Sequence, residues 1–383
     1  MRLFSTVFLV QLILSVYLGY RIGQTFPRKG PWRVFLYTLL GIELLIYFIG
    51  WIFMDMFPIR TLGVIMRYCN SFFLLSCLMV LPVLLLNLFR RYLFRGYRIR
   101  YAIENDKKIR RISSGFILLS FVIALFGMYF GKKRVTEPVV RTLSLELGES
   151  RDVLNREKRE LKVALITDLH ISESIGLSEV KTMVDLVMSQ NPDVILMGGD
   201  HIDHFGYFAY TPEIIHLLGE KLQAPYGKYY VLGNHEYRAD MEEKIQWITR
   251  VGGTLLRDDI VFPADSAFCL IGRDDATNIR RESLSSLTGR AGVRDKAIIV
   301  LDHQPVPLDS LEACKVDLAL CGHTHAGQIW PFGMLVRLKY ASLAYGMHQQ
   351  GNSRIYTSSG VGAASPAYRM GTRSEIVIFD LKL

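Results

Sequence analysis

Four long apolar stretches within the first 130 residues restrict the fold more than any other feature of this sequence. Each has roughly the 20 residues that an α-helix needs to cross the hydrocarbon of a membrane. A buried bundle of soluble helices is the alternative, but such helices seldom stay apolar on every face over this length. No A-x-A-like cleavage site follows the first stretch, which argues against a signal peptide. We therefore predict a transmembrane region of four helices, over Leu3–Tyr20, Val34–Phe57, Cys69–Phe89 and Ile112–Phe130.

The positive charge of the chain is concentrated in the same region. Residues 1–134 contain 19 of the 45 Lys and Arg residues and only four acidic ones, a balance of +15, whereas residues 135–383 have a balance of −6. We therefore divide the chain into a transmembrane anchor, 1–134, and a second domain, 135–383. Because the second domain is acidic, broad binding to a nucleic-acid phosphate backbone is not expected.

The distribution of Lys and Arg among the loops predicts the orientation of the anchor. Loops 21–33 and 90–111 lie on one side of a four-span topology and contain 13 basic residues, against seven on the other side. The positive-inside rule then places both termini and the second domain outside the cytoplasm. The run Lys132-Lys133-Arg134, directly after the last span, favours the opposite orientation and is the counter-signal to this prediction.

Two acidic residues, Glu43 and Asp55, fall within the second apolar stretch. Ionisable groups inside a membrane often mark function. Asp55 is near the end of the stretch and Glu43 has no obvious charged partner, so we expect polar helix packing rather than a functional site.

After about Val139 the hydrophobic pattern changes to short apolar runs that alternate with amphipathic segments. This alternation predicts an α/β domain of 249 residues. The three cysteines of the domain, Cys269, Cys314 and Cys321, fall in apolar, strand-like runs without CxxC spacing, so buried free thiols are expected. Val135–Glu160 is interpreted as a connector with a first edge strand. The predicted strands are Leu161–Thr167, Asp193–Met197, Lys228–Val231, Ala297–Leu301, Asp317–Cys321, Arg354–Thr357 and Glu375–Leu381, and the predicted helices are Leu177–Ser189, Thr211–Leu222 and Met241–Val251.

Five of the predicted strands end in a polar cluster. Because the carboxyl ends of strands in an open α/β sheet lie at one edge, the five clusters are expected to converge on one crevice. Together they offer carboxylate, amide and imidazole ligands, which suit Mn, Fe or Zn, and no thiolate. The clusters are Thr167-Asp168-Leu169-His170, Gly198-Gly199-Asp200-His201-Ile202-Asp203, Gly233-Asn234-His235-Glu236, Asp302-His303-Gln304-Pro305 and Gly322-His323-Thr324-His325.

These motifs resemble, in order, the five motifs of the calcineurin-like metallophosphoesterases. The resemblance covers about residues 161–383 and implies a two-sheet sandwich flanked by helices, a four-layer αββα fold. The tail, from Gly327-Gln328-Ile329 to Glu375-Ile376, looks like a membrane-associated branch of bacterial phosphodiesterases that also resembles UDP-2,3-diacylglucosamine hydrolases. The expected location is therefore a bacterial cell membrane.

The resemblance also implies a role for each site residue. Asp168, His170 and His325 would hold one divalent ion. Asn234, His303 and His323 would hold a second, and the Asp200 carboxylate would bridge the two. Two such ions can clamp a phosphate, activate a nucleophile and stabilise an in-line displacement.

Two further residues are expected to act on the reaction. His235 would face the leaving oxygen, which it stabilises or protonates. Asp203 is interpreted either as an acceptor that orients this imidazole or as a loop cap. The sequence departs from the family at His201, usually aliphatic and here expected to be a half-exposed loop residue, and at Ala326, where Gly is common.

These observations predict a membrane-anchored, binuclear-metal phosphoesterase that hydrolyses a phosphodiester or pyrophosphate bond in a lipid-linked or envelope substrate. The known lipid-A-pathway hydrolase works in the cytoplasm, which conflicts with the topology predicted above. The segment Trp330–Gln350 is expected either to wall the substrate pocket or to form an ordinary hydrophobic hairpin. The alternatives are a membrane receptor or scaffold that uses the second domain only for binding, or a phosphomonoesterase or nuclease of the same family.

Overall fold

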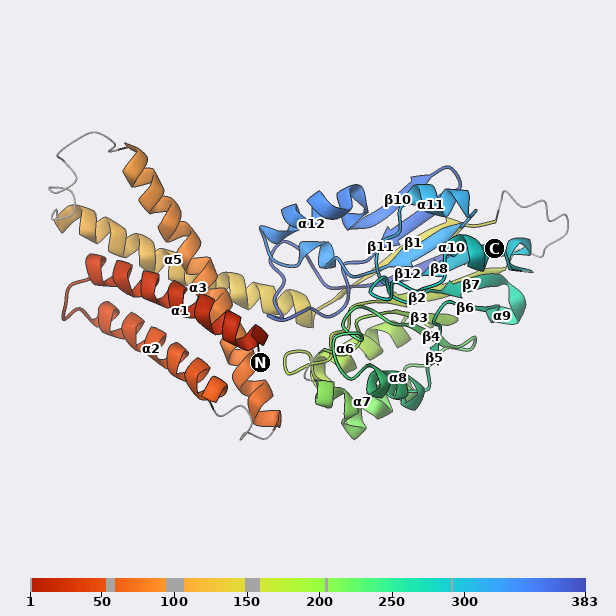
Figure 1. Ribbon diagram of the computed structural model, residues 1–383, viewed down its shortest axis with the longest axis horizontal. Helices are drawn as coiled ribbons and strands as arrows, with labels where there is room; N and C mark the ends of the chain where they lie inside the picture. The colour runs from red at the N-terminus through yellow and green to blue at the C-terminus, as the bar shows by residue number, and fades with distance from the viewer. Residues whose placement is uncertain (1, 53–58, 94–106, 149–158, 204–205, 291) are drawn as a thin grey trace. The chain divides into compact units, whose positions relative to one another are not determined.

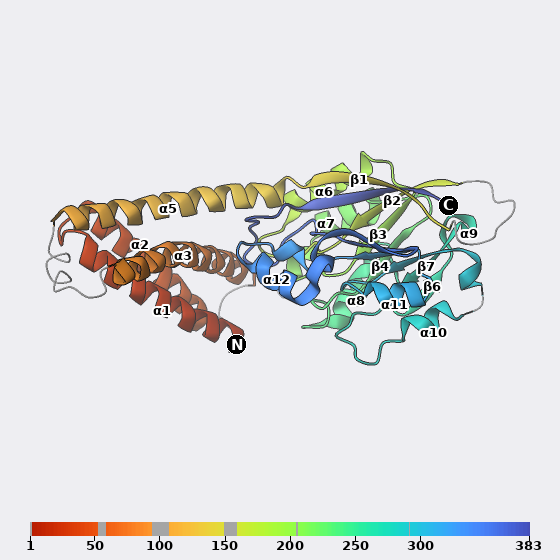
Figure 2. The same ribbon diagram turned by 90° about the horizontal axis from the view of Figure 1, so that it is seen from above.

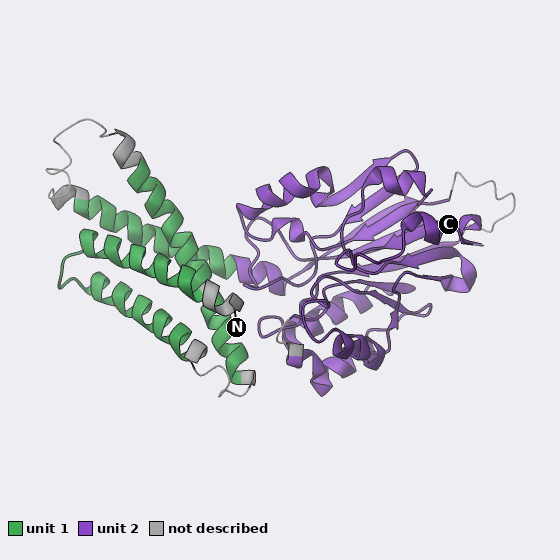
Figure 3. Ribbon diagram, viewed as in Figure 1, with its two compact units in different colours: residues 1–130 green, residues 131–383 purple. Residues whose placement is uncertain are grey.

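The computed structural model describes residues 2–52, 59–93, 107–148, 159–203, 206–290 and 292–383. The chain forms two compact units, Met1–Phe130 and Gly131–Leu383 (Figure 3). The division falls within the last long helix of the N-terminal region. Each unit is described by itself.

Long helices make up the described part of the first unit. They are α1 (Arg2–Thr25), α2 (Pro31–Ile52), α3 (Ile59–Leu93) and α5 (Lys107–Thr136), the last of which continues into the second unit. Within the described residues, three segments are long and apolar enough to cross a membrane: Pro31–Ile49, Thr61–Leu88 and Arg110–Thr136. Only 17% to 28% of their most apolar windows is buried inside the structure, so apolar side chains face outward, as they do in a bilayer.

The expectation of four spans is therefore met for three of them. The first stretch, Leu3–Tyr20, is helical within α1, but it is not among the three segments found in the described residues. The side chains before Phe8 lie outside the described part, and the remainder of α1 includes the polar residues Gln11 and Ser15, which are buried. Asp55 also lies outside the described residues.

Glu43 joins three helices through hydrogen bonds. Its Oε1 accepts from Ser76 Oγ of α3 at 3.1 Å and from Gln11 Nε2 of α1. Gln11 Nε2 also lies 3.0 Å from Ser15 Oγ and from Ser76 Oγ. Because Glu43 is only 2% exposed, these polar contacts replace water inside the bundle. Glu43 has the packing contacts that the sequence predicted.

The second unit contains two six-stranded sheets (Figures 1 and 2). The first has the order β1-β12-β2-β3-β4-β5, with β12 antiparallel to β2 and the other neighbours parallel. Its strands are β1 (Val139–Glu146), β2 (Glu160–Ile166), β3 (Val194–Gly198), β4 (Lys228–Val231), β5 (Thr254–Leu255) and β12 (Glu375–Lys382).

The second sheet has the order β10-β11-β9-β8-β7-β6, with antiparallel strands only at its two edges. Its strands are β6 (Asp259–Val261), β7 (Phe268–Gly272), β8 (Ala297–Leu301), β9 (Leu318–Cys321), β10 (Gly346–Gln350) and β11 (Ser353–Thr357). The helices of the unit are α6 (Leu177–Met188), α7 (Pro212–His216), α8 (Met241–Arg250), α9 (Pro263–Ser266), α10 (Leu284–Thr288), α11 (Leu308–Ala313) and α12 (Phe332–Tyr340).

Three hydrophobic clusters define four layers. One lies between the two sheets and combines Val163 and Leu196 with Leu270 and Ile299. A second lies between the first sheet and helices α6, α7 and α8, and a third lies between the second sheet and helices α10 and α11. The unit is therefore the αββα sandwich that the sequence analysis predicted.

Local sequence patterns explain why most elements form where they do. In α6 the buried residues Val180, Met183, Val184 and Val187 repeat at three- and four-residue intervals, so one face of the helix packs on the sheet. Strands β4 and β8 have the predicted bounds, and β1 is the predicted edge strand. Two interpretations were wrong. Cys314 follows α11 rather than lying in a strand, and Trp330–Gln350 contains α12 instead of forming a simple hairpin.

Candidate metal centre

The five polar clusters come together at the carboxyl ends of five strands. Three follow β2, β3 and β4 of the first sheet, and two follow β8 and β9 of the second. The expectation that the clusters converge was correct, but they meet where two packed sheets end rather than at the edge of one open sheet.

The first group of candidate ligands is Asp168, His170 and His325, whose ligand atoms all lie within 4.8 Å of one another. His170 Nε2 is 3.0 Å from His325 Nε2, and His325 Nε2 is 3.5 Å from Asp168 Oδ1. All three side chains are buried. These are the residues that the sequence analysis assigned to one ion.

A second group contains Asp200, His303 and His323, within the same distance limit. His303 Nε2 lies 3.3 Å from Asp200 Oδ2 and 3.2 Å from Asn234 Oδ1. His303 Nδ1 donates to the carbonyl of Gly198 at 2.9 Å, which directs Nε2 toward the carboxylate. Asn234, the expected fourth ligand, therefore lies beside this group.

Asp200 lies between the two groups. Its Oδ2 is 3.7 Å from His170 Nε2, 3.3 Å from His303 Nε2 and 3.9 Å from His235 Nε2. The other oxygen, Oδ1, accepts from the backbone N–H of His235 at 2.8 Å, which holds the carboxylate in place. This central position is the one that a bridging ligand needs.

Asp203 contacts two imidazoles rather than the one expected. Its Oδ1 lies 2.6 Å from His235 Nδ1 and 2.7 Å from His170 Nδ1. Both rings therefore donate through Nδ1 and turn Nε2 toward Asp200. His235 also belongs to a third group of possible ligands, with His170 and Asp200, so its position is compatible with metal binding as well as with proton transfer.

Glu236, for which the sequence alone indicated no role, organises the loops. Its Oε2 accepts from the backbone N–H groups of Asp200 and Gly233, at 2.9 and 2.7 Å. Its Oε1 accepts from those of His201 and Ile202. One buried carboxylate thus satisfies four backbone donors from two strand ends. The only sequence signal for this role is an acidic residue directly after the site residues Asn234 and His235.

The backbone of the site is strained in a way that is common at functional sites. Asp168, His170, Asp200, His323 and His325 all have φ between +49° and +70°. Non-glycine residues in this left-handed region cost roughly 1–3 kcal/mol each and persist where the surrounding structure holds them. The strand ends therefore turn abruptly and bring their side chains into the crevice.

Burial and mutual contact set the charges of the acidic groups. Burial alone would raise the pKa of Asp200, but the imidazoles of His303, His170 and His235 outweigh it and hold that pKa well below its usual range. The pKa of Asp203 is likewise lowered against burial, by His170 and His235. Burial, with a further contribution from the charge of Asp200, raises the pKa of Asp168.

The histidines divide into two kinds. Burial alone would lower the pKa of His170 and of His303. Nearby carboxylates outweigh burial, and they raise the pKa of His170 to about 9 and that of His303 well above its ordinary value. Burial, together with the charge of His303, lowers the pKa of His323 to about 4, and burial and His170 lower that of His325. The site thus favours positive charge beside its carboxylates. Bound divalent ions would supply that charge and would keep all the ligating imidazoles neutral.

The donor set fits divalent ions. Asp168 and Asp200 are buried, and no Lys or Arg of the described residues forms an ion pair with either carboxylate. Buried carboxylates need a compensating charge. Imidazoles and one amide oxygen surround them, which is a ligand set for Mn, Fe or Zn.

His201 is not the half-exposed loop residue that was expected. It is 1% exposed, packs against Tyr230 and Trp247, and donates through Nε2 to the carbonyl of Val231 at 2.9 Å. Burial lowers the pKa of His201, so the ring is a neutral core side chain. The aromatic neighbours come from β4 and α8, which explains why the sequence alone did not reveal them.

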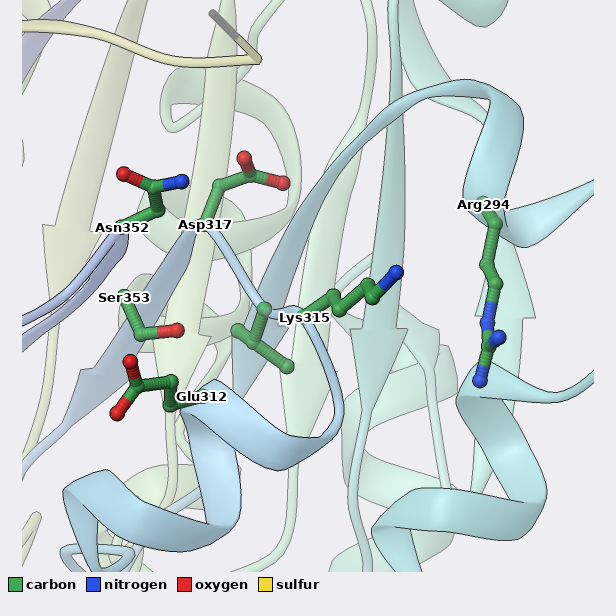
Figure 4. A pocket seen from close by; sticks show the side chains of 7 residues that line it. Arg294, Glu312, Lys315, Asp317, Asn352 and Ser353 are labelled. Carbon is green, nitrogen blue, oxygen red and sulfur yellow. The ribbon is translucent and has the colours of Figure 1, made fainter. Parts of the chain in front are cut away.

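A pocket of about 360 Å³ lies elsewhere on the unit. Figure 4 shows Glu312, Asn352 and Ser353 on one side of it and Arg294 on the other. Asp317 precedes β9 and Ser353 begins β11, so this pocket lies at the amino ends of these strands. The candidate metal ligands follow the carboxyl ends, and the pocket is not part of the candidate centre.

The fold is an αββα sandwich with groups of candidate metal ligands, and comparisons with known proteins agree with this class of protein. A family model described as calcineurin-like phosphoesterase matches residues 161–327. An uncharacterized metallophosphoesterase of Helicobacter pylori is 30% identical over 292 residues, which cover 74% of this chain and 76% of that protein. One from Campylobacter jejuni is 29% identical over 276 residues, 70% of each chain. The protein belongs to the metallophosphoesterase family, whose members are metal-dependent phosphoester hydrolases that typically bind two divalent ions.

A further relative extends over nearly the whole chain. The zebrafish (Danio rerio) protein named "transmembrane protein with metallophosphoesterase domain" is 23% identical over 398 residues, which cover 99% of this chain and 87% of that protein. Its name and the three apolar helices found here both indicate membrane association.

Proposed function

We propose that this protein is a membrane-anchored phosphoesterase that uses two divalent ions to hydrolyse a phosphodiester or pyrophosphate bond. Residues 1–134 serve as the anchor and residues 135–383 as the catalytic domain. The observation that carries the proposal is the position of Asp200, whose Oδ2 lies within 4 Å of imidazole nitrogens from three loops. A carboxylate so placed is suited to bridge two ions.

The proposed roles follow the geometry. Asp168, His170 and His325 would hold one ion, Asn234, His303 and His323 the other, and Asp200 both. Bound ions of this kind polarise the phosphoryl group and activate water.

His235, oriented by Asp203, completes the reaction. Water adds to phosphorus and loses a proton to solvent, the bond from phosphorus to the leaving oxygen breaks, and His235 Nε2 donates a proton to that oxygen. The imidazole then regains a proton from solvent. Asp203 accepts from Nδ1 at 2.6 Å and stabilises the imidazolium before it donates.

A combined metal and activity assay tests the proposal. Full-length protein, purified in detergent, is analysed for bound Mn, Zn and Fe and assayed with chromogenic phosphodiesters and phosphomonoesters. Hydrolysis of the diester that disappears with a chelator and returns with metal supports the proposal. Metal binding without turnover of any ester in a lipid and nucleotide panel would indicate the receptor or scaffold, and preference for monoesters would indicate a phosphomonoesterase.

A lipid-linked or envelope substrate is proposed because the anchor keeps the active site close to a bilayer. The finer resemblance to UDP-2,3-diacylglucosamine hydrolases is compatible with this class of substrate. A member that acts on cytosolic nucleotide-sugar intermediates has to face the cytoplasm, so the side of the membrane decides between these substrates.

The catalytic domain is expected outside the cytoplasm of a bacterial cell. A reporter fused after Leu383 measures this directly, because the loops that contain 13 basic residues should stay inside. Alkaline phosphatase fused there should be active, and a fluorescent protein that matures only in the cytoplasm should be dark. The reverse pattern would show that Lys132-Lys133-Arg134 outweighs the loops, and it would favour the nucleotide-sugar substrate.

A further inference from the structure

Helix α12 presents an unusually apolar surface to solvent. Phe332, Met334, Leu335 and Leu338 are 57%, 64%, 60% and 83% exposed, and Trp330 just before the helix is 65% exposed. The less exposed positions are Gly333, Val336 and Tyr340, which repeat at three- and four-residue intervals and form the face that packs on the domain. The outward face therefore has the large apolar side chains, together with exposed Arg337 and Lys339.

Helix α12 packs directly on the last metal-binding motif. Gly327, at the end of that motif, approaches Gly333 so closely that a Cβ atom at position 327 would overlap the backbone of α12. The ring of Tyr340 lies edge-on to the ring of His323, with 5.9 Å between centroids. Whatever binds the outward face of α12 is therefore held next to the metal centre.

Backbone contacts connect the start of α12 to the end of the last membrane-spanning segment. The backbone N–H of Trp330 donates to the carbonyl of Met370 at 2.6 Å. Arg369 directly precedes Met370, and its backbone N–H donates to the carbonyl of Gly131 at 3.0 Å. Gly131 directly follows Phe130, the last residue of the apolar stretch Ile112–Phe130. Both views show α12 at the end of the unit where α5 enters it (Figures 1 and 2).

The chain connection is also short. Helix α5 ends at Thr136 and β1 begins at Val139, so only Glu137 and Pro138 lie between them. A domain joined to a membrane-spanning helix by two residues stays at the membrane surface. A bilayer that contains α5 is therefore the apolar phase nearest to the start of the second unit.

We propose that α12 inserts its outward face into the interfacial layer of an anionic phospholipid bilayer, with Arg337 and Lys339 at lipid phosphates. Interfacial helices have this composition, with Trp, Phe and Leu on the buried face and basic residues at the headgroups. The helix then brings the headgroup of a lipid-linked phosphoester to the metal centre. This last step rests on the proposed function, whereas insertion of the helix does not.

Depth-dependent fluorescence quenching tests the insertion. Leu338→Cys in the full-length protein is labelled with bimane and reconstituted into phosphatidylglycerol–phosphatidylcholine vesicles that contain lipid with a spin label near the glycerol. The label should lose about half of its fluorescence. The matched control is Phe262→Cys, which is 39% exposed and precedes α9 at the opposite end of the unit (Figures 1 and 2), and it should not be quenched. Unmutated protein measures background labelling of the native cysteines.

A charge variant tests the link to the substrate. Leu335→Asp/Leu338→Asp should leave hydrolysis of a soluble chromogenic diester within about twofold and lower hydrolysis of phospholipid in vesicles by about tenfold or more. Ile279→Asp, at a residue that is 94% exposed outside α12, should change neither.

The outcomes separate the two proposals. Quenching at position 338 without hydrolysis of any lipid ester supports insertion and removes only the lipid substrate. Absence of quenching overturns the inference, whether or not lipids are hydrolysed. Efficient disulfide formation between two Leu338→Cys chains, without quenching, would show that a second copy covers the helix and would also overturn it.

Discussion

Replacement of Asp200 by Asn is expected to lower the metal content from about two divalent ions per chain to fewer than one, and turnover by about 10³-fold or more. The variant removes the negative charge that lies within 4 Å of His170, His235 and His303. The amide keeps an oxygen that can accept from the His235 backbone, so the fold should persist. Elemental analysis, steady-state kinetics and a thermal unfolding scan measure the three quantities.

The matched control for this experiment is Asp203→Asn. It makes the same chemical change within the same crevice, but Asp203 contacts Nδ1 atoms of imidazoles rather than lying in a group of candidate ligands. Asp203→Asn should therefore retain both ions. If Asp200→Asn also retained both, or if active unmutated protein contained one tightly held ion, the binuclear arrangement would be wrong.

His235→Ala should separate metal binding from chemistry. We expect both ions to remain and turnover to fall by about 10²–10⁴-fold, the range for a positioned acid–base group. The deficit should be smaller for nitrophenyl esters than for alkyl esters, because a good leaving group needs little protonation. Paired metal analysis and kinetics with a series of leaving groups measure this.

His323→Ala, which removes a candidate metal ligand, is the control for His235→Ala. His323 lies in a candidate ligand group with Asp200 and His303, and its low pKa keeps it neutral near pH 7. Its removal should lower metal occupancy. If His235→Ala lost metal to the same extent, His235 would be a ligand, as its distance of 3.9 Å from Asp200 Oδ2 permits, and another group would have to protonate the leaving oxygen.

Some features of this protein follow from local sequence. Hydrophobic periodicity identified strands such as β4 and β8 and helix α6, because their burial depends on neighbours within the same segment. Polar residues directly after apolar strands identified the crevice, because a chain that leaves a buried strand exposes its next side chains at the edge of the sheet. The apolar stretches identified the N-terminal helices for a similar reason, since length and composition are local properties.

Other features depend on contacts between distant segments and were not evident in the sequence. His201 is a core residue because Tyr230 and Trp247 lie against it, and Glu236 organises the loops because its carboxylate meets amides from another strand end. Neither pairing leaves a periodic signal. The polar face of α1 illustrates the same limit, since Gln11 contacts Glu43 and Ser76 from two other helices.

The sequence by itself identified the candidate metal ligands and the order in which they follow the strands, because each candidate is placed by its own strand end. Only the tertiary structure decided that two sheets share one crevice, that Asp203 contacts both His170 and His235, and that the apolar side of α12 faces outward. The physical reason is that hydrogen-bond partners and solvent exposure are properties of the packed chain. The sequence around a residue limits the secondary structure and the chemistry available to it. The segments packed against the residue decide which contacts it makes and how exposed it is.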